Sequence, residues 1–156
     1  MDKYIQRLLE AAEKGVENAV IQTAKLLEKE NKRYAPIDTG SLKDSIYTSV
    51  KKSDYMADVK AKAPYAGYVI HGTGIYNTQG VHTRSGWMYY ASSPSSRYYG
   101  WHFTQGQKAN DFPRRAYQKS QDEISRILQS EIHKAISNIQ WRWLHDKLHF
   151  GLNEYS

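Results

Sequence analysis

The stretch APIDTGSLKDSI (residues 35–46) separates a helical segment before it from short apolar runs after it. Pro36 predicts the end of the first helix, because the residue before a proline is disfavoured in the helical conformation. Asp38 or Thr39 is expected to cap the short helical turn that follows, since both side chains accept hydrogen bonds from free backbone N–H groups. Gly40 lets the chain bend at this point. The stretch therefore predicts a transition from helix to strand.

Upstream of this stretch, apolar residues recur at three- and four-residue spacing with Lys, Glu and Gln between them. This pattern predicts one long amphipathic helix over about 3–33, which tolerates Gly15 at some cost. Downstream, β-branched and aromatic residues predict two strands within 45–53 and 55–63, joined through residues 52–54.

The rest of the chain continues this mixed pattern. PYAGYVIHG (64–72) predicts a short helix or turn, and a polar loop is expected over about 72–86. GWMYYAS (86–92) and SRYYGWHFT (96–104) predict a second hairpin. A last helix is expected after the Asn-Asp pair at 110–111, either residue of which can cap it. Its predicted buried stripe comprises Tyr117, Ile124, Ile127, Leu128, Ile132, Ala135, Ile136, Ile139 and Trp143.

The order helix, two strands, short helix or turn, two strands, helix defines the fold class as α+β. We expect two long amphipathic helices, N- and C-terminal, packed on one face of a roughly four-stranded antiparallel sheet. Residues 1–140 are interpreted as a single domain. Residues 141–156 form an aromatic C-terminal extension that can continue the last helix, and its apolar side chains are expected to be buried against the parent helix or a partner.

Composition narrows the functional classes. The 156 residues include no cysteine, which excludes disulfides, thiolate nucleophiles and thiolate metal sites. Charges interrupt the apolar positions of the N-terminal segment, so we expect neither a signal peptide nor a membrane-spanning helix there. The chain is expected to be a cytoplasmic product with no membrane partner.

The net charge of +6 is concentrated in the middle of the sequence. Residues 1–34 and 111–156 each hold seven basic and six acidic side chains, whereas residues 35–110 hold eight and four. Between Val59 and Asn110 there is no Asp or Glu, while Tyr and Trp are frequent. Such a stretch suits a nucleic-acid or protein interface. The alternative is a tyrosine-rich sheet with a mildly basic solvent face.

No constellation of catalytic residues emerges. The tripeptide Asp-Thr-Gly (38–40) also carries the catalytic aspartate of aspartic proteases, but those enzymes need two carboxylates and the chain has no second copy. Neither a nucleophile elbow nor a phosphate-binding glycine loop is present. His145 and His149 have the i, i+4 spacing of a zinc-binding pair but lack a third ligand. We therefore expect no catalytic site, no metal site and no cofactor, with these two histidines as the only metal candidates.

Three segments, in order, resemble the signatures of one family. APIDTGSLKDSI (35–46) is similar to an Ala-Pro-(Val/Ile)-Asp-Thr-Gly-x-Leu-(Arg/Lys)-x-Ser-Ile element that follows a first long helix. YAGYVIHGT (65–73) resembles Tyr-Ala-x-Tyr-Val-Glu-x-Gly-Thr, with Ile70 in place of the Glu. NDFPRRAY (110–117) resembles a Pro-Phe-Leu-x-Pro-Ala element that opens the last helix, although Asp and Arg stand where prolines are common. The family is that of minor tail or neck components of long-tailed bacteriophages and prophages, and the resemblance covers about residues 1–137. The motif positions are Pro36, Asp38, Thr39, Gly40, Leu42, Ser45, Ile46, Tyr65, Tyr68, Gly72, Thr73, Phe112 and Ala116.

The resemblance implies a non-enzymatic structural protein of the virion neck or tail, made in the bacterial host cytoplasm. It implies a ring of about six or twelve copies that joins or completes the tail and lets DNA pass, formed by repeated head-to-tail contacts. The isolated chain can still be monomeric. Neighbours would be head-closure or portal-side proteins and tail-tube or terminator proteins. The residues expected to face the next subunit or passing DNA are Lys51, Lys52, Lys60, Lys62, Arg84, Trp87, Tyr90, Tyr99 and Trp101.

A rival hypothesis is a free nucleic-acid-binding protein. In that case Lys51, Lys52, Lys60 and Lys62 would contact phosphates, and the tyrosines would stack on bases.

Overall fold

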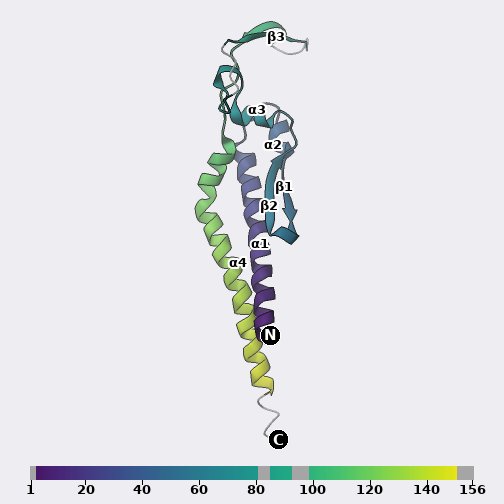
Figure 1. Cartoon of the computed structure of the whole chain (residues 1–156), viewed down its shortest axis with the longest axis vertical. Helices are drawn as coiled ribbons and strands as arrows, with labels where there is room; N and C mark the ends of the chain where they lie inside the picture. Colours follow the sequence, from purple (N-terminus) through teal and green to yellow (C-terminus); the bar gives the residue numbers. More distant parts are fainter. Residues whose placement is uncertain (1–2, 81–84, 93–98, 151–156) are drawn as a thin grey trace. The chain divides into compact units, whose positions relative to one another are not determined.

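The computed structural model describes residues 3–80, 85–92 and 99–150 (Figure 1). Its element order confirms the predicted succession of helices and strands. The elements are α1 (Lys3–Tyr34), α2 (Ser41–Ser45), β1 (Ile46–Lys51), the 3₁₀ turn η1 (Lys52–Asp54), β2 (Met56–Ala61), α3 (Ala66–His71), the 3₁₀ turn η2 (Gly74–Tyr76), β3 (Trp87–Ala91), β4 (Gly100–Thr104) and α4 (Phe112–Phe150). Because α4 extends to Phe150, residues 141–150 continue the last helix.

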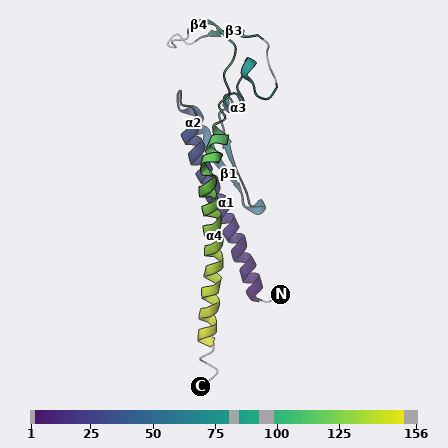
Figure 2. The ribbon, with the colours of Figure 1, turned by 90° about the vertical axis from the view of Figure 1, so that its left-hand side faces the viewer.

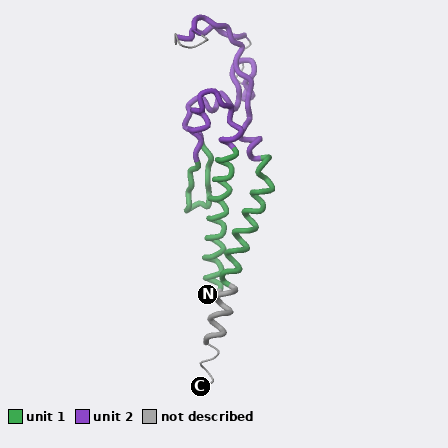
Figure 3. The backbone as a smooth tube through the Cα atoms, turned by 180° about the vertical axis from the view of Figure 1, so that it is seen from behind, with its two compact units in different colours: residues 1–30, 48–60, 118–156 green, residues 31–47, 61–117 purple. Residues whose placement is uncertain are grey.

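The chain divides into two compact units, each built from separate segments of the sequence (Figure 3). Unit 1 comprises Met1–Glu30, Thr48–Lys60 and Gln118–Ser156. Unit 2 comprises Asn31–Tyr47 and Ala61–Tyr117.

In unit 1, α1 lies between α4 on one side and the β1–β2 hairpin on the other (Figures 1 and 2). Gly15 allows the two helices to approach closely, since a Cβ built on it would lie 2.8 Å from the Cβ of Ala135. On the opposite face of α1, the hydroxyl of Thr48 donates to the carboxylate of Glu28 at 2.7 Å. Lys52 forms an ion pair with Glu17 at 3.0 Å. α1 therefore contacts α4 through small residues and the β1–β2 hairpin through polar side chains.

The predicted buried stripe of α4 is wrong in part. Leu128, Ile132 and Ile136 are 37–40% exposed, and Tyr117 is exposed as well. The buried positions include Ser120 and Glu131 instead. The reason is the close approach at Gly15, which brings the backbone of Glu131 itself against α1 and turns the neighbouring aliphatic residues outward. Ile124, Ile127, Ala135 and Ile139 are half-buried, and the side chain of Trp143 lies outside the described residues.

The expected four-stranded sheet is also wrong. β1 pairs only with β2, and β3 pairs only with β4, so the strands form two separate two-stranded antiparallel sheets. A four-stranded sheet requires that one face of every strand be buried, which is what specifies the register. Neither face of the β3–β4 pair is buried, since β3 is exposed from Trp87 to Tyr90 and β4 alternates half-buried with exposed residues, so nothing in this pattern specifies a register against β1 and β2.

In unit 2, the motif stretch departs from the expected capping. The N-cap of α2 is Gly40, with φ 87° and ψ −16°, and no side chain caps this helix. Asp38 is exposed, whereas Thr39 forms a hydroxyl–hydroxyl hydrogen bond with Ser41 at 2.9 Å. The left-handed conformation favours glycine, so the chain bends at Gly40 as expected, and Gly40 occupies the cap position in place of Asp38 or Thr39. The hydroxyl of Thr39 still accepts the N–H of Ser41, the first residue of α2, at 3.4 Å.

The start of α4 confirms the predicted cap. The backbone N–H of Arg114 donates to the carboxylate of Asp111 at 3.2 Å, which is the bond that an N-cap aspartate forms with the third helical residue. Asn110 accepts a second bond from the guanidinium of Arg115. Phe112 and Ala116, both motif positions, are buried on the first turns.

Candidate interface: the aromatic hairpin

The β3–β4 pair presents an uncharged, aromatic surface. The register pairs Trp87 with Thr104, Met88 with Phe103, Tyr89 with His102, Tyr90 with Trp101 and Ala91 with Gly100. We call Trp87–Ala91 and Tyr99–Thr104 the aromatic hairpin. It contains no Asp, Glu, Lys or Arg. Both strands therefore expose large side chains to water without any Asp, Glu, Lys or Arg among them.

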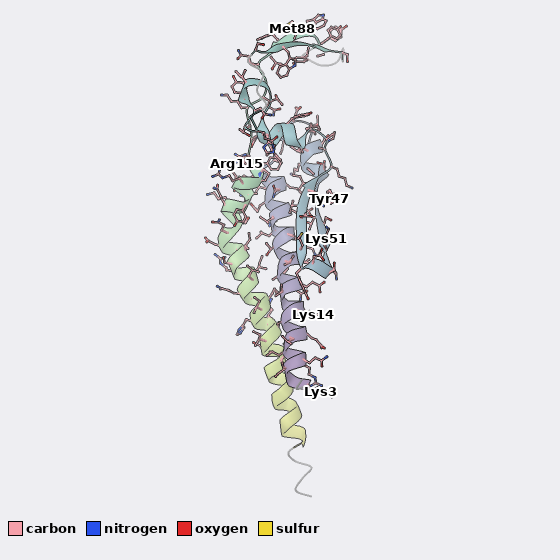
Figure 4. All side chains as sticks on the ribbon, in the orientation of Figure 1. Lys3, Lys14, Tyr47, Lys51, Met88 and Arg115 are labelled. Carbon is pink, nitrogen blue, oxygen red and sulfur yellow. The ribbon has the colours of Figure 1, made fainter. Side chains whose placement is uncertain are left out.

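One face of the aromatic hairpin gathers the largest apolar side chains. Because side chains alternate along a strand, Met88 and Tyr90 lie on the same face as their partners Phe103 and Trp101. The ring of Tyr90 lies 5.3 Å from that of Trp101 and 5.9 Å from that of Tyr99. Figure 4 marks Met88 on this hairpin. Trp101 is 69% exposed and Phe103 63%.

The exposed area is large for an unpartnered surface. With roughly 200 Å² per aromatic side chain and about half of it exposed, the five side chains of this face present on the order of 500 Å². That approaches the upper end of apolar patches on monomers and supplies much of the ~800 Å² that one partner contributes to a standard interface. The face is therefore suited to binding a protein.

Hydrogen bonds between residues 69–75 and residues 105–110 anchor the aromatic hairpin within unit 2, and we call this set of bonds the clamp. Thr73 donates its N–H to the carbonyl of Gln107 at 2.9 Å, and its hydroxyl accepts the N–H of Gln107 at 2.8 Å. The N–H of Ile75 donates to the carbonyl of Gln105 at 3.0 Å. On the other side of the clamp, the N–H of Asn110 donates to the carbonyl of Val69 at 2.9 Å. These bonds fix the two segments that lead into β3 and out of β4.

Gly72 makes this clamp possible. It adopts a φ of 73°, and a Cβ at this position would lie 2.7 Å from the carbonyl oxygens of Gln107 and Tyr76. No other residue fits such a backbone approach without a shift. The motif residues Gly72 and Thr73 thus belong to the clamp that anchors the aromatic hairpin and do not form a binding pocket.

Hydrogen bonding within the aromatic cluster affects ionisation. The hydrogen bond between the hydroxyls of Tyr99 and Tyr90, helped by desolvation, raises the pKa of Tyr90 above its ordinary value. A tyrosine is neutral at physiological pH in any case, and this shift moves the ionisation of Tyr90 further from that range.

The net charge of the chain lies entirely in unit 2. Unit 1 holds thirteen basic and thirteen acidic residues, and unit 2 holds nine and three. Two lysines of unit 2 lie over tyrosine rings, Lys62 over Tyr47 at 5.1 Å and Lys108 over Tyr76 at 5.9 Å.

The structure separates the residues expected at the interface. Tyr90, Tyr99 and Trp101 come together on one face of the aromatic hairpin, while Trp87 lies on the opposite face with its ring against Gly74. The lysines at 51, 52 and 60 belong to unit 1 instead. Lys52 pairs with Glu17 and Lys60 with Asp58, at 3.0 and 3.2 Å, so carboxylates accompany part of the expected phosphate-binding set. Arg84 lies outside the described residues.

The motif residues of the second signature differ in exposure. Tyr65 and Tyr68 are exposed on either side of the start of α3, whereas Val69 packs inward. In the first signature, Leu42 and Ile46 are buried and Ser45 bonds the carbonyl of Leu42 at 2.8 Å. The first signature therefore contributes core and the second contributes both core and surface.

The metal hypothesis concerns side chains that the structure does not describe, since His145 and His149 fall in that part of α4. Among the described side chains, no group of three His, Asp or Glu could hold a metal ion. Among the residues that the structure describes, no helix combines the length and apolar character that a membrane crossing requires.

Sequence reasoning missed Met88 and Phe103 as members of the exposed face. Both lie in predicted strands, and the register pairs them directly. The strand sequences alone left the register open, because aromatic residues occur on both faces. Once the register is known, the alternation of side chains along each strand places Met88 on the face of Tyr90 and Phe103 on the face of Trp101.

Comparison with known proteins finds a similarity for the N-terminal part of the chain. Residues 1–72 match a family described as "Bacteriophage HK97-gp10, putative tail-component". This is a class of structural phage proteins. Over these residues the chain is similar to the HK97-gp10-like family of putative phage tail components. The match includes the first signature and the second as far as Gly72, and the third lies beyond it. No curated protein and no solved structure matches the chain.

Proposed function

We propose that this tail component is a non-enzymatic structural protein of the head–tail connection, where about six or twelve copies form a ring that joins or completes the tail and lets DNA pass. Its neighbours would be head-closure or portal-side proteins on one side and tail-tube or terminator proteins on the other. The protein would be made in the bacterial host cytoplasm and end up in the virion neck or tail.

The observation that carries this proposal is the aromatic hairpin. An isolated two-stranded ribbon is only marginally stable in water, and this one exposes aromatic rings on a charge-free surface. Its stability and solvation both improve when a partner covers it. A ring provides such a partner at every position, since each subunit has a neighbour.

A hairpin variant in assembling phage tests the proposal. Replacing Trp101 and Phe103 together by Ser should leave the α1–α4 pair intact, because both side chains are exposed. We expect particles with separated heads and tails and a large loss of infectivity. A matched control replaces exposed Gln118 and Gln121 of α4 by Ser and should assemble normally. Complete, infectious virions from the hairpin variant or from a deletion of the gene would refute the proposal.

The concentration of net charge in unit 2 favours a second candidate, a free nucleic-acid-binding protein. A salt titration of DNA binding separates the two. Tight binding at physiological salt with a steep dependence on salt concentration supports the second candidate, because phosphate contacts release counterions. Weak or absent binding by the isolated chain supports the structural role.

A further inference from the structure

A second apolar surface lies on unit 1. Three side chains of α1 and three of α4 are each 37–51% exposed despite being aliphatic. They are Ile5, Leu9 and Val16 on α1 and Leu128, Ile132 and Ile136 on α4, and we call these six residues the helical strip. The spacings of four and seven residues on α1 and of four on α4 place each trio on one face of its helix.

Both trios lie on the same side of the helix pair. Gly15, Glu131 and Ala135 form the contact between α1 and α4. Val16 and Ile132 each follow a contact residue by one position, which rotates them by about 100° from the contact line in the same sense. The helices run antiparallel, as Figures 1 and 2 show, so the same rotation brings both side chains to the same side. The six residues of the helical strip therefore lie on one side of the helix pair.

An acidic residue, Glu13, borders the helical strip on α1. Glu13 lies four residues after Leu9 and three before Val16, which places it on their face. A surface that covers the strip should consequently be apolar, should carry no carboxylate and should belong to a region of positive charge.

The aromatic hairpin meets all three requirements. It exposes apolar rings, lies in the stretch without Asp or Glu, and belongs to the unit that holds the net positive charge. We propose that the aromatic hairpin of a second copy of this chain docks on the helical strip. Unit 2 of each copy then binds unit 1 of the next, and such a contact between two different surfaces repeats around a ring. This inference rests on the proposed function and names the two surfaces that form the ring contact.

Disulfide cross-linking in assembled particles tests the docking. The chain has no cysteine, so each introduced thiol is unique. Particles are assembled in cells that produce two variants together, Ile132→Cys in the helical strip and Met88→Cys in the aromatic hairpin, and are then oxidised with copper–phenanthroline. Mass spectrometry of the disulfide-linked peptides distinguishes mixed from same-site products. A second pair, Val16→Cys with Ser92→Cys and a short bis-maleimide, keeps every aromatic side chain and covers a shifted docking register.

The expected result is a mixed strip–hairpin product in at least severalfold excess over that of a control pair, Lys14→Cys with Met88→Cys. Lys14 is exposed on α1 (Figure 4) and precedes the contact residue Gly15, so it lies away from the strip. Adding Glu13→Lys should lower the mixed yield severalfold. Particles that contain both variants but give only same-site products, or as much product with Lys14→Cys, would overturn the docking while leaving a ring intact. If particles assemble fully without incorporating the protein, the proposed function falls as well.

Discussion

Gly15 offers a direct test of how closely α1 and α4 pack. Replacing a glycine by alanine inside a helix normally stabilises it by about 1 kcal/mol. At Gly15, however, the new Cβ would lie 2.8 Å from the Cβ of Ala135 and 3.2 Å from the carbonyl oxygen of Glu131. Neither atom is the end of a flexible side chain, so the helices must move apart. Overpacking of this kind costs about 1–3 kcal/mol. The net expectation for Gly15→Ala is a loss of about 1 kcal/mol in the free energy of unfolding.

Urea unfolding followed by far-UV circular dichroism measures this loss, because a change in midpoint at constant slope reports stability. Gly67 supplies the matched control. It is also helical, in α3, but a Cβ there would meet nothing within 4 Å. Gly67→Ala should therefore stabilise the protein by about 0.5–1 kcal/mol. Combining Gly15→Ala with Ala135→Gly should recover most of the overpacking cost, which a double-mutant cycle isolates. If Gly15→Ala stabilised the protein as much as Gly67→Ala, the close helix contact would be refuted.

Three further predictions concern Thr23, Gly72 and Glu131. Thr23→Val should stabilise the protein by about 1 kcal/mol in the same urea assay, because the hydroxyl of Thr23 is buried without a hydrogen-bond partner among the described residues; an unchanged or lower midpoint contradicts it. Gly72→Ala should destabilise by about 2 kcal/mol or more, since it combines a left-handed φ with clashes against backbone oxygens, and near-UV circular dichroism should show the loss of aromatic order; a wild-type spectrum would argue against the clamp. Hydrogen bonds from Lys134 and then Gln22, opposed by desolvation, lower the pKa of Glu131. A lowered folded-state pKa gives stability that is present above the ordinary carboxyl value of about 4.3 and is lost as pH falls below it. Glu131→Gln should flatten this acid limb of a stability–pH curve, and an unaltered limb would refute the assignment.

Local patterns predicted the elements well because they reflect the chain's own periodicity. The helical spacing before Pro36 predicted α1 to within a residue or two, and the Asn-Asp pair at 110–111 predicted a cap for α4, which the structure assigns to Asp111. The aromatic residues at 87–91 and 100–104 predicted both strands of the second hairpin. These features depend on neighbours in sequence.

Features that depend on distant neighbours were less accessible. The buried face of α4 includes Glu131, whose carboxylate is satisfied by Lys134, and excludes Ile132, although apolarity alone indicates the reverse. The choice follows from Gly15, more than a hundred residues earlier in the sequence. In the same way, Gly40 rather than Asp38 occupies the cap position of α2, because that position has a left-handed backbone conformation, which favours glycine over a residue with a hydrogen-bonding side chain. The separation of the two hairpins likewise required knowledge of the tertiary packing.

The aromatic hairpin also affects the tendency of the unassembled chain to aggregate. Its strands combine high β-propensity with no charge and no proline, and both edges of a two-stranded sheet carry unpaired backbone groups. These are the properties of segments that nucleate disordered aggregates. In the proposed role, ordered assembly competes with off-pathway association, and the rates of both rise with concentration. We expect overproduction without its assembly partners to drive the chain into inclusion bodies, and balanced synthesis to keep it available for tails.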